Sequence, residues 1–196
     1  TSNSIICPNC KSHMKPASTI SDQPSEFWLE CTNCNALINT YKPQPHQLAL
    51  HQDQTLYVLN AGGYGTGKTL TSRQEVYRHA LLTPNANILI GAKITAQYEQ
   101  TIKRDIEQDL PLLLVKNVSV QKSYIDLVNG ARIMFRPFDD PDKLRSLNLT
   151  MFVIIEASEV NGDTFHQLKT RLRNPNAYTP NHDWRRGIVE TNPSAG

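Results

Sequence analysis

The amino-acid sequence predicts an α/β fold in which a mostly parallel sheet has helices on both faces, preceded by a small N-terminal module. Three observations support this fold class. Strand-like and helix-like segments alternate from Thr55 onward, a glycine-rich turn joins the first of these strands to the first helix, and all four cysteines fall within the first 34 residues. Such alternation is typical of parallel sheets whose strands are connected by helices.

The composition is that of a globular chain with a buried core. Hydrophobic residues make up 39% and charged residues 19% of the 196 residues, which excludes a disordered chain. The chain has 20 Lys and Arg against 18 Asp and Glu, a net charge of +2. This balance excludes a polybasic arm or an acidic tail as the main means of binding a partner. No apolar run approaches the ~18 residues of a membrane-spanning helix, so we expect no membrane partner. The sequence shows no secretory signal and does not begin with Met, which indicates a removed start or a part of a longer chain.

The four cysteines form two C-x2-C pairs separated by twenty residues: Cys7, Cys10, Cys31 and Cys34. Two residues between cysteines let both thiolates point at one ion, and two such pairs complete a tetrahedral site for Zn²⁺. Disulfides and free thiols are the alternatives, and the lack of a secretory signal disfavours disulfides. We therefore predict a zinc ribbon over residues 1–40, with Glu26–Glu30 leading as a strand into the second pair. Its near-neutral charge favours a structural or protein-docking role over DNA contact.

The segments after the ribbon predict the elements of the sheet in order. Residues 41–54 contain two prolines and show no apolar periodicity, so we expect a linker or an extended lead-in. The short apolar run Leu56–Asn60 is typical of a strand buried on both faces, and a helix over Leu70–Leu82 follows it. Further strands are expected at Ile88–Ile90, Met151–Ile155 and Ile188–Val189, and further helices at Thr95–Leu110, ended by Pro111, and at Asp163–Arg173.

An antiparallel insertion interrupts this alternation. Apolar and polar residues alternate over Val118–Val128, Asn129-Gly130 is typical of a hairpin turn, and Ala131–Phe135 forms the returning strand. We expect these residues to extend one side of the parallel sheet.

A glycine-rich segment lies directly between the first strand and the first helix. It fits the pattern G-x4-G-K-[ST] without a gap and consists of Gly62, Gly63, Tyr64, Gly65, Thr66, Gly67, Lys68 and Thr69. Glycines let the backbone curl so that N–H groups converge on phosphate oxygens, and the helix N-terminus adds its positive end. Lys68 can then reach the β- and γ-phosphates, and the Thr69 hydroxyl can ligate Mg²⁺. The segment predicts a nucleoside triphosphate site.

Hydrolysis requires, in addition, an acidic residue at the end of a neighbouring strand. The apolar run Met151–Ile155 ends in Glu156, which places a carboxylate at the edge of the sheet where the phosphate loop opens. Many P-loop ATPases place two acids consecutively here, one for the metal and one for water, whereas this chain has Ile155 before Glu156. Either Glu156 serves both purposes, or Thr69 and water molecules hold the metal.

This ordered set of motifs resembles the ATPase domain of the large terminase subunit, the DNA-packaging motor of tailed bacteriophages. The resemblance covers about residues 41–193. The matching segments are the region of Gln47, Gly62–Thr69, Phe135–Ser146, Ile155–Val160, Gln167–Arg173 and Glu190–Pro193. It implies a P-loop ATPase domain over residues 55–196 that uses ATP and Mg²⁺ to move double-stranded DNA into the procapsid.

The resemblance also implies roles for single residues. Glu156 falls on the water-activating position and Ile155 on the metal position. Arg145 corresponds to the arginine that one subunit of a ring supplies to the γ-phosphate bound by its neighbour. The catalytic residues are then Lys68, Glu156 and Arg145. Asn192 corresponds to a coupling residue that senses the γ-phosphate. Gln47, or alternatively Gln44, would read the adenine edge, because an amide offers both a donor and an acceptor.

The partners that the resemblance implies are the portal protein, the small terminase subunit and further copies of the chain in a ring, in the cytoplasm of the host cell. The sequence contains no late acidic cluster for a two-metal nuclease, so we expect the nuclease domain of large terminases to be absent from these residues. Two other functions fit the same motifs: a helicase-like nucleic-acid translocase with a zinc module, and a slow nucleotide-dependent assembly switch.

Overall fold

The computed structural model describes residues 7, 10–16, 29–34, 41–110, 114–173 and 185–193, which form two sheets. A small antiparallel sheet pairs β1 (Met14–Pro16) with β2 (Leu29–Cys31). The large sheet has seven strands in the order β3-β9-β8-β4-β7-β6-β5. These strands are β3 (Tyr57–Ala61), β4 (Asn87–Ala92), β5 (Val115–Ser119), β6 (Tyr124–Leu127), β7 (Arg132–Pro137), β8 (Met151–Ile154) and β9 (Arg186–Thr191).

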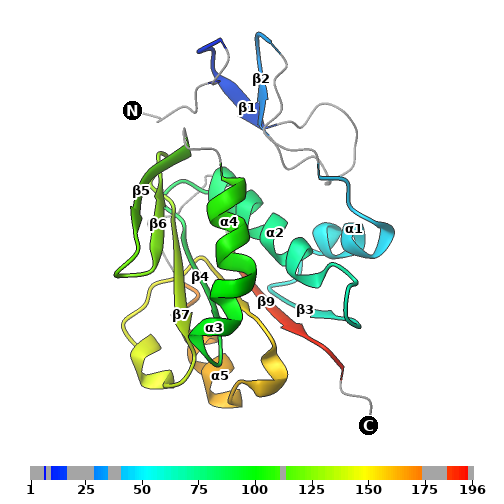
Figure 1. Ribbon diagram of the computed structural model, residues 1–196, viewed down its shortest axis with the longest axis vertical. Helices are drawn as coiled ribbons and strands as arrows, with labels where there is room; N and C mark the ends of the chain where they lie inside the picture. The colour runs from blue at the N-terminus through cyan, green and yellow to red at the C-terminus, as the bar shows by residue number, and fades with distance from the viewer. Residues whose placement is uncertain are drawn as a thin grey trace.

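Five of these strands are parallel and two are antiparallel. Strands β3, β9, β8, β4 and β7 pair in parallel, and β6 and β5 extend the sheet beyond β7 in antiparallel fashion. The carboxyl ends of the parallel strands therefore meet at one edge, which is the lower edge of the sheet in Figure 1. The α/β class with an antiparallel insertion is confirmed.

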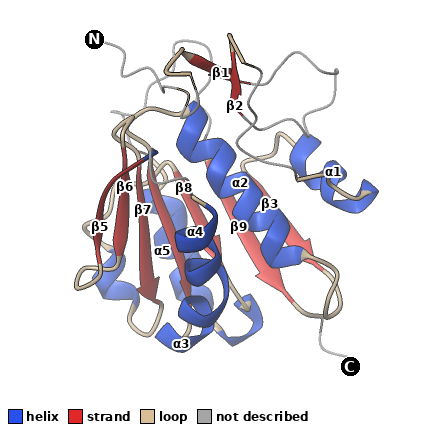
Figure 2. Ribbon diagram, turned by 45° about the horizontal axis from the view of Figure 1, so that its top comes forward, coloured by secondary structure: helices blue, strands red, loops and turns tan. Residues whose placement is uncertain are grey.

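The helices cover both faces of the large sheet (Figures 1 and 2). They are α1 (Pro45–Gln52), α2 (Lys68–Leu82), α3 (Thr95–Tyr98), α4 (Arg104–Asp109) and α5 (Gly162–Arg171), with a π-helical turn at Glu99–Lys103 and 3-10 turns at Pro141–Leu144 and Ala157–Glu159. Among the described residues, none of these helices combines the length and the apolar character that crossing a membrane requires.

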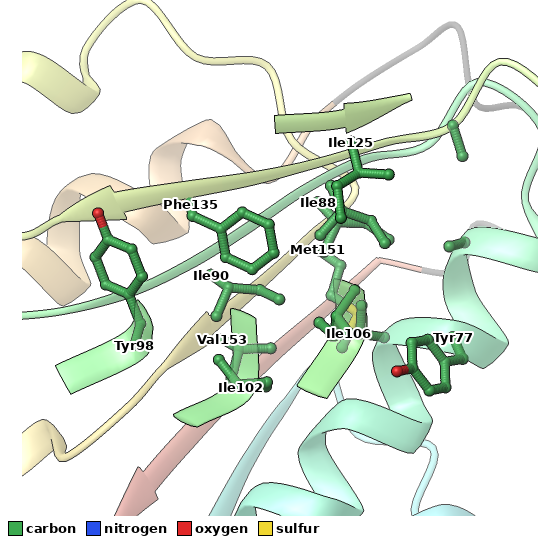
Figure 3. Close-up of a cluster of buried hydrophobic side chains, with 14 of the residues drawn as sticks. Tyr77, Ile88, Ile90, Tyr98, Ile102, Ile106, Ile125, Phe135, Met151 and Val153 are labelled. Carbon is green, nitrogen blue, oxygen red and sulfur yellow. The ribbon is translucent and has the colours of Figure 1, made fainter. Parts of the chain in front are cut away.

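Alternating side chains of the central strands fill two separate cores. Ile88 and Ile90 of β4 point to the face covered by α2 and by the helical segment 95–109, whereas Leu89 points to the face covered by α5. Figure 3 shows the first core, where Ile90 and Val153 lie among aromatic and aliphatic side chains from the helices. This double burial explains why the central strands are short, continuous apolar runs.

The structure corrects two local expectations and confirms a third. Residues Pro45–Gln52, expected as an extended lead-in, form α1, with proline at the start of the helix. The helix expected over Thr95–Leu110 is confirmed as a continuous helical segment over residues 95–109, which contains the π-helical turn. Val118–Val128 is two strands, because a turn at Val120–Ser123 separates β5 from β6.

That turn depends on Ser123, whose φ of 48° is left-handed although it is neither glycine nor asparagine. The Asn129-Gly130 turn between β6 and β7 is confirmed, with a φ of 87° at Gly130. The expected helix end at Pro111 and the expected strand lead-in at residues 26–28 lie outside the described residues.

The contact between β4 and β7 leaves no room for a side chain at Gly91. A Cβ there would lie 2.2 Å from the carbonyl oxygen of Arg136 and 2.5 Å from the ring of Phe138. We expect Gly91→Ala to lower the free energy of unfolding by about 2 kcal/mol or more, because the obstructing atom is backbone. Urea denaturation followed by circular dichroism measures this change.

Gly162→Ala is the matched control, since a Cβ at the start of α5 would meet nothing within 4 Å. We expect it to leave the urea midpoint unchanged or slightly raised. Equal midpoints for the two variants would contradict the packing argument.

Candidate functional site

The glycine-rich loop connects the end of β3 to the start of α2 and contains two glycines in a left-handed backbone conformation. Gly65 and Gly67 adopt φ values of 74° and 80°, which a side chain would disfavour. Gly67 is the N-cap of α2, so the first free N–H groups of a 15-residue helix face the loop. The Lys68 ammonium folds back over the loop and donates to the carbonyl oxygens of Gly62 and Gly63, each at 2.7 Å. Loop and helix together provide the donors for a phosphate group.

A chain of hydrogen bonds joins the loop lysine to the acidic residue that follows β8. Lys68 Nζ donates to Asn192 Oδ1 at 2.6 Å, and Asn192 Nδ2 donates to both carboxylate oxygens of Glu156, at 2.9 and 3.1 Å. The structure thus brings together three predicted site residues from three different elements.

The backbone of Glu156 explains how its carboxylate reaches this position. Its φ of 50° and ψ of 55° are left-handed, an uncommon conformation for a residue with a side chain. Ile155, the residue before it, still points into the apolar core and is 3% exposed. The left-handed residue breaks the alternation of the strand, as strained residues at functional sites often do.

A second carboxylate, not assigned a role from the sequence, lies beneath the first turn of α2. Glu190 of β9 accepts hydrogen bonds from Thr69 Oγ1 at 2.5 Å and from Ser72 Oγ at 3.0 Å. Asn60 of β3 donates to the Lys68 carbonyl oxygen at 3.0 Å and to Ser72 Oγ at 3.1 Å. The sequence signal that could have identified Glu190 is the one that identified Glu156, an acidic residue directly after an apolar strand.

Burial dominates the electrostatics of Glu190. The side chain is 2% exposed, and desolvation raises its pKa, while the hydrogen bonds from Thr69 and Ser72 and the positive charge of Lys68 act in the opposite direction. The nearby carboxylate of Glu156 raises the pKa further. A cation bound beside Glu190 would favour its charged form.

The donors around the loop suit a Mg²⁺ ion. Mg²⁺ prefers oxygen ligands, and the site offers the Thr69 hydroxyl with the Glu190 carboxylate beside it. Both side chains lie at the carboxyl edge of the parallel strands, where open α/β sheets bind their ligands.

Helix α1 closes one side of the loop. A cavity of about 240 Å³ lies here, lined by His46, Gln47, Asn60, Ala61, Gly62, Thr66, Lys68 and Thr71. Gln47, predicted to read adenine, is 4% exposed; its Oε1 accepts from the Gln44 N–H at 2.9 Å and its Nε2 donates to the Gly67 carbonyl oxygen at 3.3 Å. In this structure the Gln47 amide therefore fixes α1 to the loop.

A buried polar network holds α1 in this position. His51 Nδ1 lies 2.6 Å from Glu75 Oε1, and the Glu75 carboxylate also lies 3.2 Å from Arg186 Nε. Arg186, which is 1% exposed, donates to the carbonyl oxygens of Leu50 and Asp53 at 2.8 and 2.5 Å. The network joins the lead-in, α2 and β9, and none of its members was singled out from the sequence.

Arg145 lies away from the phosphate loop of its own chain. It follows the 3-10 turn after β7, and β4, β8 and β9 separate β7 from β3. Its guanidinium lies 2.8 Å from Asp142 and is 64% exposed. Arg171 donates to the Arg145 carbonyl oxygen at 2.7 Å, which ties this exposed segment to α5.

The four cysteine sulfurs gather in one place. They lie within 4.8 Å of one another, with Cys7 and Cys34 Sγ atoms 3.5 Å apart and Cys10 and Cys31 Sγ atoms 3.3 Å apart. Four thiolates around a tetrahedral zinc would lie about 3.8 Å apart, given Zn–S bonds of about 2.3 Å. Hydrogen bonds from the side chain and backbone of Ser12 lower the pKa of the Cys10 thiol to about 5. The cluster fits Zn²⁺.

This cysteine cluster lies far from the phosphate loop. Cys7 and Cys31 pack with Met14 against Leu114, and Leu81 borders the same apolar cluster. Leu81 is in the last turn of α2, whereas Lys68 is in the first, and thirteen residues of α-helix span about 20 Å. Figure 1 likewise shows β1 and β2 beyond the end of the sheet opposite to the carboxyl ends.

Fold and site together define a P-loop nucleotide-binding domain of the α/β class. The family model described as "Phage terminase large subunit" matches residues 54–195. The chain is 30% identical over 142 residues to the PBSX phage terminase large subunit of Bacillus subtilis (strain 168), which covers 71% of this chain and 33% of that protein. The chain therefore belongs to the phage terminase large-subunit family and spans about a third of the length of this curated relative.

Solved structures agree on the fold. The HK97 bacteriophage large terminase gives a TM-score of 0.62 at 14% identity, covering 77% of this chain and 33% of that one. The ATPase domain of the Thermus phage P74-26 large terminase gives 0.59 at 18% identity, covering 77% and 65%. The large terminase of a thermophilic bacteriophage, in complex with ATP-γ-S, gives 0.52 at 13% identity, covering 68% and 32%.

The cysteine geometry yields a prediction about metal content. We expect the unchelated protein to contain about one Zn²⁺ per chain and Cys31→Ser to lose it, because Cys31 is buried at the centre of the cluster. Elemental analysis of the purified proteins measures this. Cys31→Ser should have a lower melting temperature than the wild type but the same ATP affinity, since the cluster and the loop lie at opposite ends of α2.

Asn33→Ala is the matched control, since its backbone N–H, which lies 3.4 Å from Cys31 Sγ, is retained. It should keep its zinc. Wild-type protein that contains no metal, or in which these cysteines form disulfides, would contradict the zinc prediction.

Proposed function

We propose that this domain is the ATPase motor of a phage DNA-packaging terminase, coupling ATP hydrolysis to the movement of double-stranded DNA into the procapsid. The observation on which the proposal rests is the hydrogen-bond chain from Lys68 through Asn192 to Glu156. It joins the phosphate-binding loop, the strand beside it and the acidic residue of the next strand. Membership of the terminase family supports the same function.

In this proposal each group has a defined task. The loop N–H groups and the N-terminus of α2 hold the phosphates, and Lys68 exchanges its carbonyl partners for the β- and γ-phosphates. The Glu156 carboxylate accepts the proton of the attacking water as the water oxygen bonds to the γ-phosphorus and the bond to ADP breaks. Mg²⁺, when bound, neutralises charge on the phosphate oxygens. The ATP-γ-S complex of the thermophilic bacteriophage terminase supports nucleotide binding by this fold.

Asn192 is the residue that can report nucleotide binding. Its oxygen accepts from Lys68 and its amide nitrogen donates to Glu156. When Lys68 turns to a phosphate, the Asn192 oxygen loses this donor, and the amide that holds Glu156 is free to reorient. This exchange connects the occupancy of the loop with the position of the catalytic carboxylate and with the segment after β9.

Arg145 completes the site of a neighbouring copy in this proposal. It is exposed and lies on a segment held by α5, four strands over from its own loop. A guanidinium supplied from outside can stabilise charge that develops on the transferred phosphoryl group. The functional assembly is then a ring of this chain with the portal protein and the small terminase subunit, in the cytoplasm of the infected host.

Two further parts of the chain have roles in this proposal. Gln47 would bind the adenine edge by exchanging its backbone partners for it. The zinc ribbon would stabilise the end of the domain that lies opposite the phosphate loop.

Substitutions in the loop and after β8 separate binding from hydrolysis. We expect Lys68→Ala to weaken ATP binding by roughly 10–100-fold, since a charge-assisted contact to phosphate is lost. Glu156→Gln should bind ATP normally but hydrolyse it at least about 100-fold more slowly, because the amide cannot accept the proton. Calorimetry and phosphate release, each with and without DNA and procapsids, measure both effects.

A Glu156→Gln variant that hydrolyses ATP as fast as the wild type would remove Glu156 from this role. Turnover that depends on single strands and not on procapsids would favour a helicase-like translocase instead. Slow turnover unaffected by either would favour an assembly switch.

Mixing experiments test the role of Arg145. We expect inactive Arg145→Ala subunits to lower the activity of mixed assemblies more steeply than their fraction, because each removes the arginine from a neighbour's site. Lys143→Ala is the matched control, since Lys143 lies on the same turn and pairs with Asp139 on the surface. Activity that falls only in proportion to the fraction of Arg145→Ala subunits contradicts a role in trans.

A further inference from the structure

The position before Glu156 does not provide a metal ligand in this chain. Ile155 is 3% exposed and packs in the same apolar core as Val153 and Ile90. Glu156 itself has both carboxylate oxygens engaged by Asn192. Asn192 holds the Glu156 carboxylate in place, and position 155 adds no second carboxylate beside it.

The strand register shows where a carboxylate lies instead. β8 pairs with β9 up to Ile154 opposite Val189, and one further step along this register brings Ile155 beside Glu190. On its other side, β9 pairs Glu190 with Asn60 of the strand that leads into the loop. Because neighbouring strands lie about 4.8 Å apart, Glu190 is one strand nearer to the phosphate loop than position 155.

Glu190 also points to the correct face of the sheet. Ile188, two residues earlier on β9, lies in the core beneath α2, so Glu190 faces α2 as well. There it accepts from the hydroxyl groups of Thr69 and Ser72 in the first turn of this helix. Thr69 is the last residue of the phosphate loop and the predicted Mg²⁺ ligand.

The cost of burying this carboxylate argues against a merely incidental residue. Glu190 is 2% exposed in the middle of a parallel sheet, where charged side chains are rare unless they are paired. Its two oxygens receive one hydroxyl each, and neither contact is with an arginine or lysine. The positive charge of Lys68 acts on Glu190 without a direct contact, and a divalent cation at Thr69 would add a second positive charge beside the carboxylate.

We propose that Glu190 is the positioning residue of the Mg²⁺ site and takes the part that an acidic residue at position 155 would otherwise play. By accepting the Thr69 hydrogen, it fixes the hydroxyl so that its lone pairs are available to the ion, and its charge favours a divalent cation there. Glu156 is thereby left for the attacking water. This inference rests on the proposed function, because it assumes that the loop binds a nucleotide with Mg²⁺.

The test measures metal binding directly, using Mn²⁺ in place of Mg²⁺. The electron paramagnetic resonance signal of free Mn²⁺ is titrated in the presence of ADP, and ADP affinity is measured separately in EDTA. We expect Glu190→Gln to weaken Mn²⁺ binding roughly 10–100-fold, as removal of a group that orients a metal ligand typically does, with ADP affinity in EDTA unchanged. Glu156→Gln should retain wild-type Mn²⁺ affinity.

Glu159→Gln is the matched control, since it removes an exposed carboxylate from the same edge of the sheet, and it should bind Mn²⁺ like the wild type. Glu190→Asp keeps the charge but shortens the side chain, so we expect an intermediate Mn²⁺ affinity. If Glu190→Gln does not fold, Glu190→Asp takes its place in the test. Circular dichroism and urea midpoints report whether each variant is folded.

Two outcomes would overturn the inference. The first is wild-type Mn²⁺ affinity in both Glu190 variants, whether or not their stability is lowered, and the second is a loss of Mn²⁺ affinity in Glu156→Gln alone. A wild-type protein that binds neither ADP nor Mn²⁺ with ADP would instead refute the proposed function. The two failures are thereby distinguishable.

Discussion

The parallel pairing of β9 between β3 and β8 is the constraint on which the phosphate site depends. It places three successive carboxyl ends side by side, so that polar residues following each strand meet at one edge. Asn192 can then bridge Lys68 and Glu156, although these residues lie far apart in the sequence. The same pairing aligns Glu190 with the first turn of α2. A shift of one residue in this register would turn Glu190 to the other face of the sheet.

The sequence predicts those parts of the candidate site that depend on local geometry. The glycine spacing of the loop, the two C-x2-C pairs and the carboxylate after the strand Met151–Ile155 each act over a few residues, so each can be identified without knowledge of the fold. Glu190 also follows a short apolar run, Ile188–Val189, but its place beside the phosphate loop depends on the strand order that brings β9 next to β3, so the local sequence does not assign it a role. Helix α1 was missed for a related reason, since it is fixed by contacts to Gly67 and Glu75 and not by an apolar stripe of its own.

The separation of the two predicted metal sites follows from the length of α2. The cysteine cluster packs near the last turn of this helix and the phosphate loop begins at its first, about 20 Å away. An ion at the cysteines would therefore have no contact with a bound nucleotide and would act on the domain through packing against Leu114. Any influence on the loop would have to pass along α2 as a rigid element. This arrangement favours a structural or docking role for the ribbon over a catalytic one.

Strand β9 positions helix α1 as well as the residues beside the phosphate loop. Arg186, at its start, lies on the same face as Glu190 and binds the carbonyl oxygens that end α1, together with the Glu75 carboxylate of α2. Removing one partner from such a buried pair leaves an uncompensated charge, which typically costs about 3–5 kcal/mol, so the position of α1 is strongly restricted. Since α1 in turn holds Gln47 against Gly67, the geometry of the loop depends on both ends of one strand.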